Sequence, residues 1–399
     1  MRAPGSWRSC GLRIAGLALG LSACGGEAPV PQRAWELDVP EGLLVHNYAP
    51  VEDEMRQGNA ISYDVDLVLG EDSEDGFYRV GSIDVAPNGR IFVADTGDNH
   101  VRVFGSDGAP IATLGRQGQG PGEFQAPRSV LVGPSGDLHV LDGTNMRIST
   151  WTAELEHAGD LQAPPWIFQL LHGRPDGSWL AWTYGTAGDN PDPSSMRSRV
   201  AVVSAAGDLG DPLLDVDMNN QYTVKRDGLM SYYSDNPIAS PAVVARPGGG
   251  FFLTRSSEYQ VLAFGPDGEP EWALRAAAQP EPVPETIVDR LLTRVRDRMP
   301  DVARSELNLP EFLPALRALN VDGAGRLYVY PYVDSDVRNP PAELPVDVYS
   351  PTGERIFAGM IPNDSWSAAR GDHVFVPTLD TATEEWRVER RRMIAPYIR

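Results

Sequence analysis

Alternating apolar and polar residues, interrupted by tight-turn dipeptides, recur along the chain. The clearest copy occupies residues 83–95, continues through residues 101–108 and ends at residues 111–115. Asn-Gly and Asp-Gly between alternating segments are the strongest short-range signal for a β-hairpin. Each copy therefore predicts four antiparallel strands, which make up one blade of a β-propeller.

Glycines in the first turn of each copy mark six copies in total. They are Gly89, Gly136, Gly177, Gly249, Gly325 and Gly371. Their spacings are 47, 41, 72, 76 and 46 residues. Blades of this kind need about 40 to 50 residues, so the two long spacings indicate insertions within a six-bladed ring. We predict an all-β, six-bladed β-propeller over residues 61–399.

The last copy lacks one strand. It begins near Ser365 and provides segments around residues 374–376 and 386–390, which leaves it one strand short. Residues 63–70 have the same ending as residues 111–115 of the first copy. We expect this N-terminal strand to complete the last blade, which closes the ring and removes an exposed edge.

A single amphipathic helix is predicted at residues 284–299, within an insertion near residues 283–312. Ile287, Leu291, Val295 and Met299 line one face, and charged residues cover the others. Packing of this helix against its own domain is the simplest expectation. A partner-binding or membrane-surface role is the alternative.

Propeller geometry divides the connections between strands into two faces. The first and third connections of each blade lie on one face, and the second connection lies with the crossover to the next blade on the other. The short glycine turns fall on the first face, whereas the long segments at residues 183–199, 215–237, 279–312 and 331–345 fall on the second. Loops lengthen where function is built on a rigid scaffold, so we expect binding on this second, long-loop face.

The long-loop face would present polar and aromatic side chains that suit a protein, peptide, glycan or small polar ligand. The candidate ligand-binding residues are Asp95, Asn99, His100, Arg128, Asp142, Asn145, Arg147 and Trp166, with Tyr184, Tyr232, Tyr233 and Glu258 nearby. For Asp95 and Asp142 an alternative is open, because an aspartate that ends a strand commonly hydrogen-bonds its own loop backbone.

Catalytic signals are sparse. A metal on the axis would need histidine or carboxylate ligands from several innermost strands, and these strands offer Asp84 and, at most, His172. The sequence contains no Gly-x-Ser-x-Gly, His-Glu-x-x-His or EF-hand pattern. We therefore expect no catalytic residues, metal or cofactor. A hydrolase or lyase at the axial mouth is the alternative, and a metal-holding pocket lined by Asp84, Arg128, Gln169 and Arg317 would favour it.

The glycine-rich residues 115–124 do not predict a nucleotide site. They lack a Gly-Lys-Ser or Gly-Lys-Thr ending and precede a strand, whereas a phosphate-binding loop opens a helix. The formal net charge of −21 points the same way, because an acidic surface repels nucleic-acid phosphates. We expect no nucleic-acid partner, and cationic or neutral ligands before anionic ones.

The N-terminus predicts export. Three arginines precede the apolar residues 14–21, a run too short to span a bilayer. The following Leu21-Ser-Ala-Cys24 resembles the lipobox of bacterial lipoproteins. The resemblance implies a signal peptide at residues 1–23 and a lipid anchor on Cys24; an ordinary signal peptide with a chance cysteine is the alternative.

The residues after Cys24 predict a tether over residues 24–60, rich in proline and acidic side chains. The resemblance to lipoproteins also implies a location in the bacterial cell envelope. Gly25, rather than an aspartate, follows the cysteine, which favours the outer membrane in a Gram-negative host. Cys10 and Cys24 are the two cysteines of the sequence, so the mature domain would contain no disulfide.

Residues 93–104 and the glycine-rich residues 115–124, followed by Pro127 and a strand at 129–132, resemble the blades of NHL-type propellers. The resemblance covers residues 77–150 and extends to six-bladed propeller lipoproteins of bacteria. NHL propellers are mostly binding platforms, and a few of similar build are metal-dependent lyases or lactonases. The resemblance therefore implies a lipid-anchored binding or scaffold module, with a lactonase-like or amidating-lyase-like enzyme as the alternative.

Overall fold

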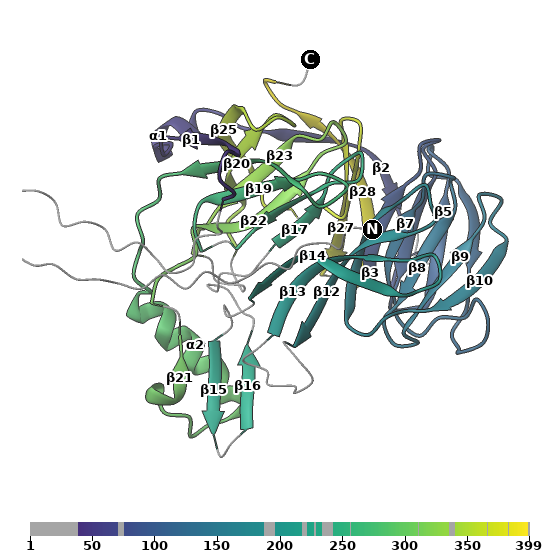
Figure 1. The fold of residues 1–399 in the computed structure, drawn as a ribbon, viewed down its shortest axis with the longest axis horizontal. Coiled ribbons are helices and arrows are strands. Elements are labelled where there is room, and N and C mark those ends of the chain that lie inside the picture. The colour runs from purple at the N-terminus through teal and green to yellow at the C-terminus, as the bar shows by residue number, and fades with distance from the viewer. Residues whose placement is uncertain are drawn as a thin grey trace, which may run out of the picture. The chain divides into compact units, whose positions relative to one another are not determined.

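The computed structural model describes residues 39–70, 76–186, 196–217, 222–226, 229–233, 242–255, 257–309, 311–334, 340–364, 366–381 and 383–397 (Figure 1). The expected signal peptide and Cys24 lie outside the described residues. None of the helices in the described part of the chain has the length and apolar character needed to cross a bilayer.

Six blades make up most of the fold, and the consecutive strands of each blade lie side by side in chain order across its sheet. The first blade contains β3 (Val80–Val85), β4 (Ile91–Asp95), β5 (His100–Phe104) and β6 (Pro110–Leu114). The second contains β7 (Pro127–Val132), β8 (Leu138–Asp142), β9 (Arg147–Trp151) and β10 (His157–Gln162). The third contains β11 (Ile167–Gly173), β12 (Trp179–Thr186), β13 (Met196–Val203) and β14 (Leu209–Asp217). The fourth blade contains β17 (Ala242–Ala245), β18 (Phe251–Thr254), β19 (Gln260–Phe264) and β20 (Pro270–Ala276). The fifth contains β22 (Leu316–Val321), β23 (Leu327–Pro331), β24 (Glu343–Tyr349) and β25 (Arg355–Pro362). The sixth contains β26 (Ala368–Arg370), β27 (His373–Asp380) and β28 (Glu385–Ile394). The prediction of an all-β, six-bladed propeller is confirmed.

Left-handed backbone at the turns explains why the glycine repeat marks the blades. Gly89 has φ of 84° and its amide donates to the carbonyl of Ala86 at 2.9 Å, which closes the hairpin between β3 and β4. Only glycine adopts such a φ without steric cost. The outer hairpin of the second blade closes instead with Leu155 at φ of 69°.

An N-terminal strand lies on the outer edge of the last blade. This strand, β2 (Ser62–Leu69), pairs antiparallel with β28, with Ser62 opposite Ile394 and Leu69 opposite Val388. Leu69 also belongs to a buried cluster that contains residues of the first blade and of the last, among them Ile83 and Phe375. The two ends of the blade series therefore share one core.

Residues 44–60 pack on the propeller, which shortens the expected tether of residues 24–60. Strand β1 (Leu44–Tyr48) adds to the outer edge of the fourth blade as a parallel partner of β20. In the short helix α1 (Asp53–Gln57), the buried Arg56 donates two hydrogen bonds to Asp347 of β24, at 2.8 and 3.0 Å. A segment that is paired and buried in this way is part of the folded body and not a linker.

Two long crossovers combine into one small helix-and-sheet insertion, visible in Figure 1 as α2 beside β15, β16 and β21. Its sheet contains β15 (Tyr222–Arg226), β16 (Leu229–Tyr233) and β21 (Leu307–Asn308), and a short 3-10 helix spans Arg304–Glu306. Helix α2 (Glu285–Arg298) buries Ile287, Leu291 and Val295 against Val224 and Val302. The amphipathic helix thus packs on its own domain.

Candidate functional site

Two of the predicted site residues, Asp95 and Asp142, are fully buried and hold the chain that enters their blades. Asp95 accepts the backbone amides of Tyr78 at 3.1 Å and Arg79 at 3.0 Å. Asp142 accepts that of Gln125 at 2.8 Å and that of the next residue at 3.2 Å. Burial and these amide bonds favour the structural alternative for both aspartates, because neither carboxylate is open to a ligand.

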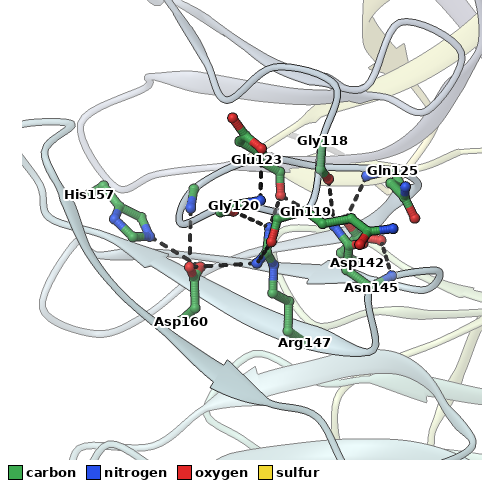
Figure 2. Close-up of polar contacts among 11 residues, drawn as sticks. Gly118, Gln119, Gly120, Glu123, Gln125, Asp142, Asn145, Arg147, His157 and Asp160 are labelled. Carbon is green, nitrogen blue, oxygen red and sulfur yellow. Dashed lines mark hydrogen bonds and ion pairs between the residues drawn. The ribbon is translucent and has the colours of Figure 1, made fainter.

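Asn145 and Arg147 fix the glycine-rich loop between the first two blades, as Figure 2 shows. The Arg147 guanidinium donates to the carbonyls of Gln119 at 3.1 Å and Gly120 at 2.7 Å, and also to that of Glu123. The Asn145 amide donates to the carbonyl of Gly118 at 2.9 Å. Both side chains, predicted to meet a ligand, therefore have internal partners and shape the loop instead.

Asn99 and His100 lie at the β4–β5 connection on the long-loop face. Asn99 adopts φ of 61°, a left-handed conformation that asparagine tolerates better than most residues. Nδ1 of His100 lies 3.1 Å from the carboxylate of Asp98. These two residues form the tip of a hairpin, and the structure gives neither a place in the cavity described next.

The innermost strands enclose an axial cavity of about 1240 Å³, larger than most pockets that hold drug-sized ligands. Every blade contributes to its wall, with Ser82, Arg128, Gln169, Val244, Asn320 and Ala369 as one example from each. Asp84 also lines it, but Arg317 is not among its lining residues. In the described part of the chain, no three His, Cys, Asp or Glu side chains are grouped as metal ligands.

The side chain of Asp84 ties the first two inner strands together. Its carboxylate accepts the amide of Val85 and, across the blade boundary, that of Val132, each at 2.7 Å. Ser82 accepts the amide of Val130 at 3.0 Å in the same way. Burial raises the pKa of Asp84 to about 6. The carboxylate thus has a clear structural role at the wall of the cavity.

Aromatic side chains gather where β11 and β12 reach the long-loop face. The ring centroids of Phe168, Trp182 and Tyr184 lie between 5.0 and 5.4 Å apart. The guanidinium carbon of Arg128 lies 5.1 Å from the centroid of Phe168, a cation–π contact. Phe168 lines the cavity and is 37% exposed, so the cluster presents an aromatic surface there. We call this end of the cavity, on the long-loop face beside Arg128 and Phe168, the mouth.

Trp166 immediately precedes β11 and adopts an unusual conformation. It is 67% exposed and has φ of 69°, which is a true outlier for so bulky a residue. Its carbonyl accepts the amide of Tyr184 at 3.0 Å. The carbonyls of Arg79 and Ala126 accept the equivalent amides in the first two blades, and both of these residues line the cavity. Trp166 thus occupies the equivalent position in the third blade, at the edge of the cavity, although it is not itself among the lining residues.

Of the predicted residues, Arg128 lines the cavity, whereas Trp166 and Tyr184 lie beside Phe168 and are not themselves among the lining residues. The sequence reasoning missed Phe168 and Trp182. Phe168 is the extra residue where the β11–β12 register shifts, between Ile167 and Gln169, and simple alternation does not reveal such a bulge. Tyr232 and Tyr233 belong to β16 of the insertion, and Glu258 lies just before β19.

Comparisons with known proteins agree with this architecture. Residues 73–239 match a family model, DUF5128, described as a 6-bladed beta-propeller. A search of curated proteins finds no match. Among solved structures, a Bacteroides fragilis protein described as exported is similar with a TM-score of 0.51 and 13% identity, over 88% of this chain and 99% of that one.

Two further solved structures match this chain to different degrees. A DUF4221 family member from Bacteroides vulgatus has a TM-score of 0.51 and 9% identity, over 84% of this chain and 99% of its own. A virginiamycin B lyase from Staphylococcus aureus has a TM-score of 0.42 and 10% identity, over 84% of this chain and 100% of its own. The similarities at a TM-score of 0.51 show a shared fold. The narrower resemblance to NHL-type propellers stays a prediction.

Proposed function

We propose that this protein is a non-catalytic binding module of the bacterial envelope, anchored by a lipid on Cys24. Its proposed ligand is a protein, peptide or glycan, which binds at the end of the axial cavity on the long-loop face. The observation that carries the proposal is the left-handed backbone of the exposed Trp166. A left-handed backbone costs an L-residue about 1–2 kcal/mol, and two thirds of Trp166 faces solvent, which leaves most of its ring open to a ligand. Strain of this kind is typical of functional sites.

The surroundings of Trp166 support the same site. Phe168 and Tyr184 form an aromatic surface beside it, and Arg128 makes a cation–π contact with Phe168. Tyr78, which is 73% exposed, occupies the rim of the first blade next to Arg79. Exposed aromatic rings beside arginine, around a preformed cavity, are the usual composition of a recognition site.

The N-terminal sequence supports the envelope location. The lipobox-like residues before Cys24 would direct lipidation, and a solved structure with a similar fold is described as exported. Residues 44–60 pack on the propeller, so the anchor would connect to it through a shorter tether than the sequence predicted.

The experiment compares Trp166→Ala with Ile111→Ala on glycan and peptide arrays. Ile111 is a suitable control because it is also exposed, at 48%, but lies in β6 on the outer side of the first blade. We expect the wild-type protein and Ile111→Ala to bind the same probes and Trp166→Ala to lose them, with all three proteins folded by circular dichroism. Undiminished binding by Trp166→Ala would overturn the proposed site.

A further inference from the structure

We infer that the mouth of the axial cavity recognises a saccharide that carries a carboxylate group, held by Arg128 and Arg79. This inference rests on the binding site proposed above and assigns it a ligand class. It also reverses the expectation from the sequence that anionic ligands are disfavoured, because the charge of the cavity mouth differs from that of the whole chain.

The first argument is unpaired positive charge. Arg79 precedes β3 and Arg128 lies near the start of β7, so the two arginines lie at the same end of neighbouring inner strands, and both line the cavity. Neither forms an ion pair within the described part of the chain. Arg246, which also lines the cavity, is by contrast paired with Glu271 at 2.7 Å. In a chain of formal net charge −21, free arginines at one mouth create a local site for an anion.

The second argument is the fixed position of Arg128. Its guanidinium carbon lies over the ring of Phe168, 5.1 Å from the ring centroid, and its Cδ lies so close to Gly143 that a Cβ there would approach it to 2.7 Å. This contact occupies none of the guanidinium N–H groups with a hydrogen bond, and Arg128 has no hydrogen-bond or ion-pair partner in the described part of the chain. Two parallel N–H donors match the two oxygens of a carboxylate. Arg128 is therefore preorganised for bidentate contact.

The third argument concerns the rest of the ligand. Trp166 and Phe168 offer apolar ring faces at the rim, which suit the C–H faces of a pyranose. Thr144, Gln169 and Ser367 add hydroxyl and amide groups to the cavity wall. A ligand with many hydroxyls, apolar faces and one acidic group satisfies all of these side chains at once. An acidic saccharide has this chemistry.

The test measures binding of trisaccharides of galacturonate, glucuronate and mannuronate by isothermal titration calorimetry. Each is compared with its carboxyl-reduced counterpart, which keeps the ring and loses the charge. The variants are Arg128→Gln and Arg79→Gln, with Arg304→Gln as the matched control, because Arg304 pairs with Glu285 on the exposed surface of the insertion. We expect at least one uronate to bind, with affinity that falls as salt rises. Arg128→Gln should bind it at least tenfold more weakly, and Arg304→Gln should bind it as the wild type does.

Three results would overturn the inference: no uronate binds, the reduced and acidic saccharides bind equally well, or Arg128→Gln binds the uronate like the wild type. Trp166→Ala separates this failure from that of the proposed function. If Trp166→Ala loses its array ligands while Arg128→Gln and the carboxylate make no difference, the binding site stands and the acidic saccharide does not. If Trp166→Ala retains every ligand, both are wrong.

Discussion

The left-handed backbone at Trp166 predicts an inverted order of stability between two substitutions. At an ordinary exposed position, glycine is less stable than alanine by about 0.4–1 kcal/mol, because it has more freedom in the unfolded chain. At φ of 69° alanine pays a steric cost that glycine avoids. We therefore expect Trp166→Gly to be more stable than Trp166→Ala by about 1 kcal/mol.

The comparison isolates the backbone because both variants lose the same indole contacts. With 67% of Trp166 exposed, about a third of the side chain is covered. A third of an aromatic side chain of about 200 Å², at about 25 cal/mol per Å², corresponds to about 2 kcal/mol. Trp166→Ala should therefore lose about 2 kcal/mol of unfolding free energy and Trp166→Gly only about 1 kcal/mol.

Urea denaturation followed by circular dichroism measures both free energies, provided that the two variants share one m-value. The argument is refuted if Trp166→Ala is as stable as Trp166→Gly or more stable, because the backbone at residue 166 would then not be strained. Both variants should lose ligand binding equally, since both lack the indole.

Three further predictions concern other parts of the chain. Arg56→Ala should lower the unfolding free energy by about 3–5 kcal/mol, because it removes the buried ion-pair partner of Asp347 and leaves that side chain with the Tyr259 hydroxyl. Arg56→Met combined with Asp347→Leu should recover much of that loss. Equal urea midpoints for Arg56→Ala and the wild type would show that α1 is not docked. The pKa of Asp84 rises from about 3.9 in the unfolded chain to about 6 in the folded protein. The protonated carboxyl therefore stabilises the fold fully below pH ~4, and this stabilisation, up to about 3 kcal/mol, is lost as the pH rises through ~6. Asp84→Asn should abolish this part of the pH dependence in a series of urea titrations, and an unchanged slope would contradict the assignment. Cys24→Ala should release the protein from the membrane fraction of its host, and unchanged retention would refute lipid anchoring.

The blades could be predicted from the sequence because their signals are local. A hairpin needs only a turn and two alternating segments, and both lie within about a dozen residues of Gly89 or Gly136. The packing of residues 44–60 could not be predicted in this way. Strand β1 pairs with residues 272–276, and Arg56 meets Asp347 from a helix of five residues that is too short to show a period. Such long-range contacts leave no local pattern.

The candidate site was predictable only in outline. Strand order alone places Arg128 and Trp166 on the long-loop face. The same reasoning also selected Asp142, Asn145 and Arg147, because polar residues after a strand look alike whether they bind a ligand or their own loop. Only three-dimensional contacts separate the two cases, since these residues bond to the loop of residues 118–126. The bulge at Phe168 and the strain at Trp166 likewise become visible only in the folded backbone.

The most direct test of the central claim, ligand binding at the long-loop mouth, is ¹⁹F NMR of protein labelled with 5-fluorotryptophan. The resonance of Trp166 is assigned by its absence in Trp166→Phe, and the buried Trp179 serves as an internal reference. We predict that titration with a ligand found on the arrays shifts the Trp166 resonance and leaves that of Trp179 in place. Saturation of the protein with ligand while the Trp166 resonance stays unchanged would contradict the account.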